Sequence, residues 1–139
     1  MRIKLDFPEK VVFTTEIAVR ISDVNYGGHL GNDAVLSLAH EARLQFLKSI
    51  NCTELNLFCV SIIMGDAAVV YKAEAFYGDV LQIQIAIADV SARSFDIYYS
   101  LKNKKTQQQI AIVKTGIVCF DYETRKTTNV PTEFVNLFA

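Results

Sequence analysis

A single long stretch of this chain has the hydrophobic period of an α-helix, and it constrains the fold more than any other feature. Between Asp33 and Ile50, apolar side chains recur every three or four residues and would share one helix face. That apolar stripe consists of Val35, Ala39, Ala42, Phe46 and Ile50. A helix with one apolar stripe must bury it against another layer, so the rest of the 139-residue chain has to supply a covering sheet.

The other periodic segments favour β-strands. Strand-like runs occupy residues 11–20, 60–76, 80–88, 95–101 and 110–120. The second run is interrupted by Gly65 and Asp66, and a glycine inside a strand pattern indicates a β-bulge. Short turns separate the last four runs, which favours antiparallel neighbours. A short final helix is expected after Pro131, with Thr132 as its cap.

This order of elements predicts an α+β fold for a single domain of residues 1–139. A curved antiparallel sheet of about five strands would wrap around the one long central helix. The run 110–120 is apolar on both faces, so we expect it to be an interior strand. Arg43 lies within the apolar arc of the helix, and we expect it to form a structural ion pair, for example with Asp23, or a subunit contact.

A glycine-rich loop joins the first strand to the helix and is the expected functional site. It contains three glycines and one of the chain's two histidines, at Gly27, Gly28, Gly31 and His29. Glycines let the backbone approach a ligand closely, and a helix start presents unpaired N–H groups to an anion or a polarised carbonyl. Asn32 or Asp33 is expected to be the helix N-cap.

Composition argues against several classes of function. The net charge of -1 argues against nucleic acid as a partner. No apolar run approaches the roughly 18 residues of a membrane helix. The N-terminal segment lacks the apolar core of a signal peptide, and the three cysteines have no Cys-x-x-Cys spacing, so we expect reduced thiols and a cytoplasmic location. Two histidines without a ligand cluster predict no metal, and no cofactor is expected.

Several segments, taken in order, resemble the hot-dog fold thioesterases. The loop and helix contain S-D-V-N at 22–25, G-H-L-G-N at 28–32 and H-E-A-R at 40–43. These are similar to the S-D-x-D-x-x-G-H-V-N-N and E-x-A-R segments of the branch with 4-hydroxybenzoyl-CoA thioesterase-like and acyl-carrier-protein thioesterase-like proteins. Residues 71–81 resemble the family's tyrosine-containing strand and G-D-x-L turn. Residues 118–121 and 130–131 resemble its closing strand and tail.

The resemblance implies a hydrolase of acyl-CoA or acyl-carrier-protein thioesters that forms homodimers or homotetramers. Active sites would lie between subunits, at the N-terminal end of the central helix. There a backbone N–H would polarise the thioester carbonyl, and a loop carboxylate would act as base or nucleophile. This chain departs from the pattern at two positions. Gly31 replaces the first Asn of the usual pair, and Asn25 stands where the usual catalytic Asp is found. Because Asn cannot act as a general base, the usual mechanism does not carry over whole.

Thioester hydrolysis nevertheless assigns an expected role to particular residues. The substrate-binding groups would be backbone N–H groups of Gly28, Leu30, Gly31 and Asn32, aided by the helix dipole. His29 is a candidate catalytic base, because imidazole exchanges protons near neutral pH. Asp23 would orient His29 or act directly, and Asn25 would hold the water or the carbonyl. Glu41 matches a helix glutamate of many relatives and is the fourth candidate, although its helical position is on the polar face.

Each candidate also has a structural explanation. His29 would bond the loop backbone, Asp23 would pair with Arg43 or cap the loop, and Asn25 would accept a left-handed turn conformation. Two other functions compete with hydrolysis: a non-catalytic acyl-thioester binding protein that has lost the usual Asp, and a hydratase-type enzyme on the same architecture. For the phosphates of coenzyme A, the candidate basic residues are Lys72, Arg93 and Lys114.

Overall fold

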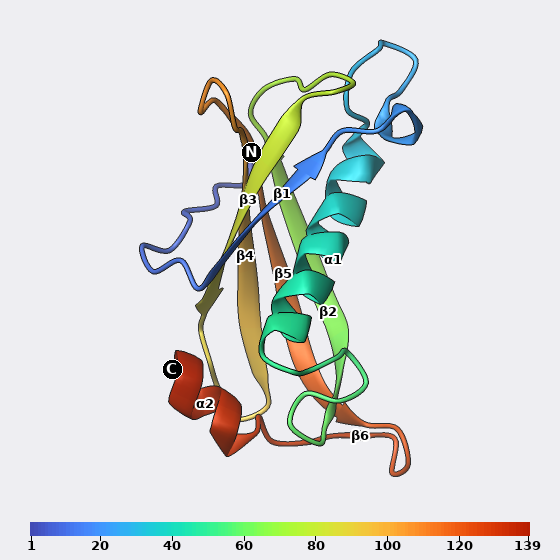
Figure 1. Ribbon diagram of the computed structural model, residues 1–139. Coiled ribbons are helices and arrows are strands. Elements are labelled where there is room, and N and C mark those ends of the chain that lie inside the picture. The colour runs from blue at the N-terminus through green and yellow to red at the C-terminus, as the bar shows by residue number, and fades with distance from the viewer.

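A long helix lies along one face of a curved antiparallel sheet in the computed structural model, which describes residues 1–139 (Figure 1). In chain order the elements are β1 (Phe13–Ala18), a short 3-10 helix (Ile21–Asp23), α1 (Asn32–Ser49), β2 (Ser61–Tyr71), β3 (Val80–Ala88), β4 (Ser94–Asn103), β5 (Gln109–Asp121), β6 (Lys126–Thr127) and α2 (Thr132–Phe138). The strands lie in the order β1-β3-β4-β5-β2, and the two-residue β6 pairs with β5. All pairs are antiparallel, so the predicted α+β arrangement is confirmed. Neither helix has the length and apolar character needed to cross a lipid bilayer.

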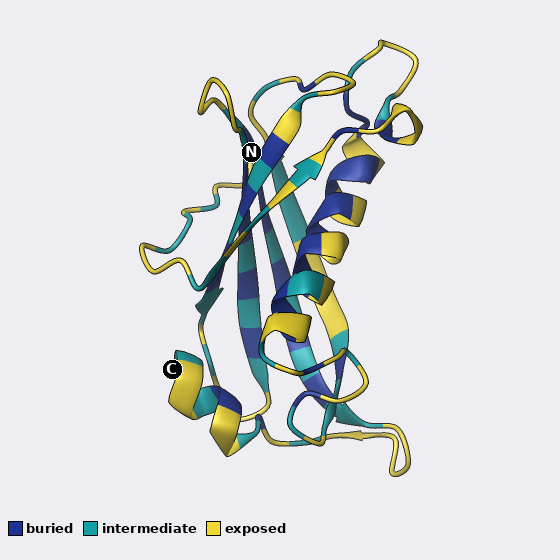
Figure 2. Ribbon diagram, in the orientation of Figure 1, coloured by how far each residue is buried: buried dark blue, intermediate teal, exposed yellow.

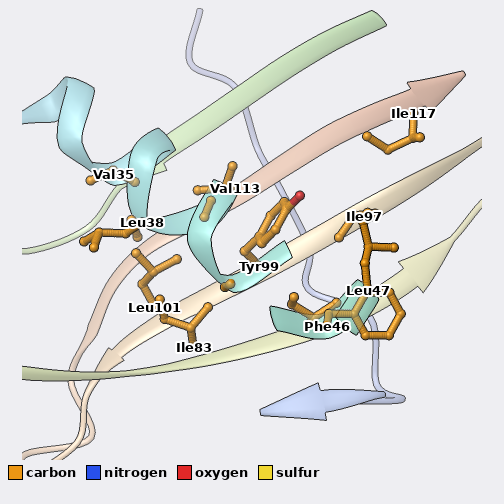
Figure 3. Packing of buried hydrophobic residues seen from close by; sticks show 14 of the residues in the cluster. Val35, Leu38, Phe46, Leu47, Ile83, Ile97, Tyr99, Leu101, Val113 and Ile117 are labelled. Atoms are coloured by element: carbon orange, nitrogen blue, oxygen red, sulfur yellow. The ribbon is translucent and has the colours of Figure 1, made fainter. Parts of the chain in front are cut away.

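The predicted apolar stripe of α1 is the side of the helix that packs on the sheet. Val35, Ala39, Ala42 and Phe46 are buried, whereas the opposite face of the helix is largely exposed (Figure 2). Side chains from α1 meet side chains that point inward from β3, β4 and β5, including Tyr99 (Figure 3). Each fully buried side chain of this size contributes roughly 1.5–3 kcal/mol relative to exposure, so this contact is what holds α1 in place. As expected, β5 is an interior strand.

Both predicted helix caps are wrong. Gly31 is the N-cap of α1 and Pro131 that of α2, and neither cap makes a side-chain hydrogen bond. Asn32 is therefore the first residue of α1 rather than its cap, and Thr132 is the first residue of α2. The consequence for α1 is that no side-chain cap covers the N–H groups of its first turn.

The buried ion pair of Arg43 is confirmed in kind, but its partner is not Asp23. The guanidinium group donates from Nε to Glu54 Oε2 at 2.9 Å and from Nη1 to the Tyr99 hydroxyl at 3.0 Å. That hydroxyl lies 2.8 Å from Oγ1 of Thr115. The carboxylate of Asp23 instead contacts Arg20. Arg43 thus joins α1 to the connector before β2 and to the sheet.

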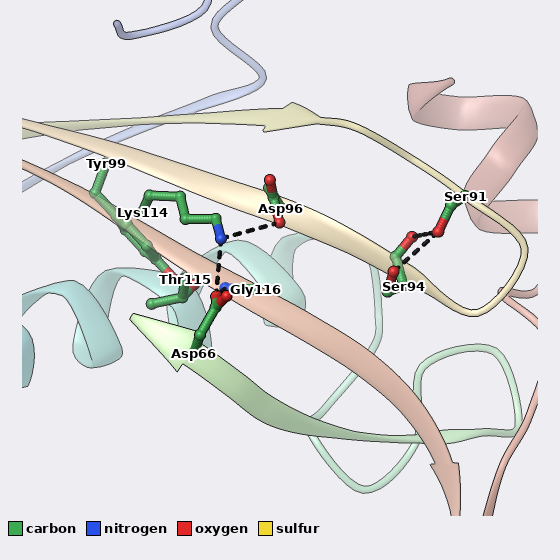
Figure 4. A network of polar contacts seen from close by, with 8 residues as sticks. All are labelled: Asp66, Ser91, Ser94, Asp96, Tyr99, Lys114, Thr115 and Gly116. Atoms are coloured by element: carbon green, nitrogen blue, oxygen red, sulfur yellow. Dashed lines mark hydrogen bonds and ion pairs between the residues drawn. The ribbon is translucent and has the colours of Figure 1, made fainter. Parts of the chain in front are cut away.

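A second polar cluster lies on the face of the sheet that points away from α1, at the predicted bulge (Figure 4). The register of β2 against β5 shifts between Met64 and Asp66, which confirms the bulge at Gly65. The Asp66 carboxylate accepts the N–H of Gly116 at 3.0 Å and an N–H of Lys114 at 2.8 Å. The bulge interrupts the backbone hydrogen bonds between β2 and β5, and the Asp66 carboxylate accepts the Gly116 N–H in place of a backbone carbonyl.

Candidate active site

The glycine loop is closed by hydrogen bonds of its own. Asn25 donates its backbone N–H to the carbonyl of His29 at 2.9 Å, and its carbonyl accepts the N–H of Gly28 at 3.1 Å. Its side-chain Oδ1 accepts the N–H of Gly27 at 2.9 Å. The left-handed backbone conformation belongs to Gly28, with φ of +80°, and not to Asn25. In this structure Asn25 is therefore the residue that shapes the turn.

Most of the predicted backbone donors already have acceptors within the fold. Gly28 donates to Asn25, Leu30 donates to the carbonyl of Ala75 at 2.7 Å, and Gly31 donates to the carbonyl of Asp23 at 2.9 Å. These three N–H groups are therefore engaged within the fold and are not free to polarise a substrate carbonyl in this structure. The N–H of Asn32 has no acceptor in the chain, as is usual for the first residue of a helix. It is the one predicted donor that remains available.

A pocket of about 240 Å³ lies at the N-terminal end of α1, and Asn32 is one of its lining residues. It is lined by His29, Leu30, Asn32, Val35, Tyr71, Ala73, Glu74 and Ile110. Three of the predicted site residues, His29, Leu30 and Asn32, meet here. The pocket is therefore lined mostly by apolar side chains, together with the first residue of α1, the imidazole of His29 and the carboxylate of Glu74.

The ring of His29 is held by the backbone in a defined orientation. Its Nδ1 lies 3.2 Å from the carbonyl oxygen of Leu30. Because a carbonyl oxygen can only accept, Nδ1 carries the proton in this contact, and Nε2 keeps a lone pair when the ring is neutral. A Cβ atom added to Gly27 would lie 3.1 Å from both Cδ2 and Nε2 of the ring, so this glycine makes room for the imidazole.

The remaining predicted residues lie outside this pocket. Asp23 is only 5% exposed and accepts hydrogen bonds from the backbone N–H and the guanidinium group of Arg20. It does not orient His29; the Leu30 carbonyl does. Glu41 lies in a separate groove between β1 and α1 and accepts a hydrogen bond from Gln45 at 2.9 Å. At 1.5 Å per residue, Glu41 is roughly 13 Å along the helix from Asn32.

Two lining residues were not among the predicted site residues. Tyr71, at the end of β2, donates its hydroxyl to the carbonyl of Asn32 at 3.0 Å and so ties the helix start to the sheet. Glu74 follows in the segment 72–76, which was predicted to continue the strand, whereas β2 ends at Tyr71. The family resemblance pointed to the tyrosine-containing strand, but no local pattern marked Glu74. No cluster of three or more His, Cys, Asp or Glu side chains is arranged to hold a metal ion.

A curved antiparallel sheet around one central helix, with a pocket at the helix start, defines the hot-dog class of proteins. The model of the thioesterase-like superfamily matches residues 19–138, and the chain belongs to that family. The fold and family predicted from the sequence are thereby confirmed.

Named relatives agree with this assignment. The chain is 27% identical over 122 residues to a 1,4-dihydroxy-2-naphthoyl-CoA hydrolase of Synechocystis, covering 86% of this chain and 88% of the relative. A crystal structure of a 1,4-dihydroxy-2-naphthoyl-CoA thioesterase from Synechocystis matches with a TM-score of 0.81 at 25% identity, covering 89% and 93% of the two chains. A DHNA-CoA thioesterase from Staphylococcus aureus shares the fold, with a TM-score of 0.77 at 18% identity over 89% and 84% of the chains. Thioester hydrolysis is the activity that the family and these relatives support.

Proposed function

We propose that the protein hydrolyses an acyl-CoA thioester in the pocket at the N-terminus of α1. The observation that carries this proposal is that Asn32, whose backbone N–H is free, and His29 line the same pocket. Hydrolysis of a thioester needs a polarised carbonyl and an activated water, and the thiolate is a good leaving group that needs no strong acid. An acyl-carrier-protein thioester is the alternative substrate.

The carbonyl oxygen of the thioester would accept the N–H of Asn32. Negative charge grows on that oxygen in the transition state, and the positive end of the α1 dipole favours it there. Tyr71 holds the carbonyl of Asn32 at 3.0 Å, so the peptide next to the donor is fixed before substrate binds. A donor that is already oriented costs little reorganisation during the reaction.

His29 would activate the water. Its Nδ1 donates to the Leu30 carbonyl, so Nε2 is the nitrogen that takes a proton from the attacking water. Asn25 and Asp23 would act as positioning residues. The first closes the turn that carries His29, and the second accepts the N–H of Gly31 through its carbonyl. Glu41, in its separate groove, has no role in this scheme.

For coenzyme A, Lys72 is the basic residue that we assign to the phosphates. Lys114 is already held by Asp66 and Asp96, and Arg93 donates to Thr127. Lys72 is exposed and directly follows Tyr71, which lines the pocket. A phosphate bound there would leave the pantetheine arm to reach the helix start.

The working form would be a homo-oligomer, either a dimer or a dimer of dimers. Strand β2 pairs only with β5, so its other edge is unpaired, and Met64 on it is 51% exposed. A long open edge presents unpaired N–H and C=O groups that can pair with another chain, and a second copy of β2 would pair with this one. Size-exclusion chromatography with light scattering should show an oligomer that Ala67→Lys on β2 disrupts and Thr14→Lys on the other edge strand, β1, does not.

A cytoplasmic location is part of the same proposal. All three cysteines are free, and Cys59 is exposed. Free thiols of this kind persist in a reducing compartment.

The test is a panel of acyl-CoA esters of different chain length and aromatic character, with release of free thiol as the signal. His29→Ala should lower kcat/KM by about 100-fold or more. The matched control is His40→Ala, which removes the other histidine from the exposed face of α1. Asp23→Asn should reduce activity less than His29→Ala, because it keeps the backbone carbonyl that accepts the Gly31 N–H and changes only the contact with Arg20.

Two outcomes would contradict the proposal in different ways. If no ester is cleaved while acyl-CoA still binds, the protein is the non-catalytic acyl-thioester binding protein. If the parent cleaves and His29→Ala cleaves equally well, the pocket at the start of α1 is not the active site.

A further inference from the structure

None of the carboxylates predicted from the glycine loop and the helix lines the pocket at the start of α1. Position 25, where an acidic residue is expected, is Asn, and its side chain closes the loop. Asp23 is buried against Arg20, and Glu41 lies in a different groove. None of these three side chains lines the pocket that holds His29.

Glu74 does line that pocket, and it comes from a part of the chain outside the glycine loop. After β2 ends, the segment that contains Glu74 crosses to the loop and is fastened there. Leu30 donates to the carbonyl of Ala75 at 2.7 Å, and His29 forms a β-bridge with Phe76. These contacts lie on the residues that follow Glu74, so the position of Glu74 relative to His29 is fixed by backbone bonds.

The Glu74 carboxylate is also not engaged elsewhere. It is an exposed residue, and none of the ion pairs in the structure includes it. An ionised carboxylate only accepts hydrogen bonds, and a water molecule between Glu74 and His29 has two hydrogens to donate. Both residues line the same pocket, so a water molecule bound between them would have an acceptor for each of its hydrogens.

We propose that Glu74 is a further catalytic residue, the carboxylate of the hydrolytic site that Asn25 does not supply. This inference rests on the proposed thioesterase function and assigns the second group that binds the attacking water. The water would donate one hydrogen bond to Nε2 of His29 and the other to Glu74. A lone pair on the water oxygen would then face the carbonyl carbon of the thioester, whose carbonyl oxygen accepts the Asn32 N–H.

The reaction balances with these groups. A bond forms between the water oxygen and the carbonyl carbon as one proton passes to Nε2 of His29. The electron pair of the C=O π bond moves to oxygen, at the N–H of Asn32. When the carbonyl reforms, the C–S bond breaks and its electron pair leaves on sulfur. The imidazolium returns its proton to the thiolate, and the new carboxylic acid loses its remaining water proton through Glu74 to solvent.

The test compares Glu74→Gln with Glu9→Gln in the full chain, using the acyl-CoA ester that the parent cleaves best. Glu74→Gln keeps the shape of the side chain, and we expect kcat/KM to fall by about 100-fold or more, mainly through kcat. Glu9→Gln removes an exposed carboxylate remote in sequence from the pocket residues and should stay within about 2-fold of the parent. Thermal midpoints of both variants should stay within about 2 °C of the parent, because exposed substitutions change stability little.

A third variant, Asn25→Asp, asks directly whether the site lacks a carboxylate. With Glu74 in that role, a carboxylate at position 25 is not needed, so the change should not raise kcat/KM above that of the parent. An Asp at position 25 keeps the acceptor for the Gly27 N–H. A gain of tenfold or more would overturn the assignment of Glu74.

The remaining outcomes separate this inference from the proposed function. An active parent whose Glu74→Gln variant keeps more than about a third of its kcat/KM overturns the role of Glu74 and leaves the thioesterase proposal intact. A parent that cleaves no thioester overturns both.

Discussion

The hydroxyl group of Tyr99 lies 3.0 Å from Nη1 of Arg43, in the interior between α1 and the sheet. Tyr99 is fully buried and Arg43 is 6% exposed, so neither group can replace this hydrogen bond with one to bulk water. The same hydroxyl contacts Thr115 at 2.8 Å. A cation therefore lies at the edge of the apolar core, and its two direct partners, Tyr99 and Glu54, come from β4 and from the connector before β2.

Tyr99→Phe should lower the free energy of unfolding by about 1–3 kcal/mol, because it leaves a buried N–H of Arg43 and the hydroxyl group of Thr115 without their partner. The matched control is Tyr98→Phe, since Tyr98 is half-buried on the opposite face of the sheet and should change stability by less than about 0.5 kcal/mol. Urea unfolding of both variants measures the difference. Equal effects of the two substitutions would show that the buried hydroxyl is not needed to satisfy Arg43.

Glu54, the carboxylate partner of Arg43, should make stability depend on pH. Burial alone would raise the pKa of Glu54, but hydrogen bonds from His40 and Arg43 and the charge of Arg43 outweigh it and lower that pKa below the ordinary 4.5. Because the pKa is lower in the folded state than in the unfolded state, Glu54 stabilises the fold fully above about pH 4.5. That contribution is lost as the pH falls through the folded-state pKa.

The measurement is urea unfolding of the parent and Glu54→Gln at pH 7 and at a series of lower values down to about pH 3.5. The parent should be more stable at pH 7, and the difference between the two proteins should shrink as the pH falls below about 4.5. Glu9→Gln serves as a control, because Glu9 takes part in none of the ion pairs. A difference between parent and Glu54→Gln that stays constant with pH would contradict the role of the ion pair.

The parts of the fold that depend on burial were predictable from the sequence. Val35 and Phe46 belong to an apolar stripe with the period of a helix, and apolar side chains repeat at that period because this face of the helix is buried. Gly65 marks the bulge because it interrupts a strand pattern. The pairing of Arg43 with Glu54 was not predictable, since it depends on how the connector folds back against α1. Periodicity carries no information about such contacts.

The candidate site was predictable in location but not in its full set of groups. The glycines and His29 marked the loop before the helix. Which N–H groups stay free depends on the strand segment that docks on the loop, and Leu30 is bonded to Ala75 by that docking. Glu74 enters the pocket for the same reason. The sequence pattern continued the strand to residue 76, whereas β2 ends at Tyr71 and the following segment turns toward the loop.

The two adjacent glycines of the loop should respond differently to replacement by alanine. Gly28 has φ of +80°, and an added Cβ would meet no atom within 4 Å, so Gly28→Ala should cost about 1 kcal/mol of stability through backbone strain alone. Gly27 does not have a positive φ, but its Cβ would press on the His29 ring at 3.1 Å. Gly27→Ala should therefore lower kcat/KM by about 10-fold, since small displacements of a catalytic group are costly.

Unfolding free energy and thioester cleavage, measured on both variants, separate these effects. Gly28→Asn is the control for strain, because Asn tolerates the left-handed region and should recover part of the loss seen with Ala. If Gly27→Ala retains full activity, the His29 ring is not held where the chemistry occurs.

The cysteines should differ strongly in reactivity, and the difference bears on any assay that follows thiol release. Burial raises the pKa of the Cys119 thiol to about 11, so at pH 8 only about one molecule in a thousand carries the reactive thiolate. Cys52 is also buried, whereas Cys59 is exposed.

The native protein should therefore consume one equivalent of an aromatic disulfide reagent rapidly, and the unfolded protein should consume three. Cys59→Ser should abolish the rapid phase, and if it does not, Cys52 or Cys119 is reached by local opening of the structure. Cleavage of acyl-CoA is best followed in this Cys59→Ser background, where the thiol signal comes from the released coenzyme.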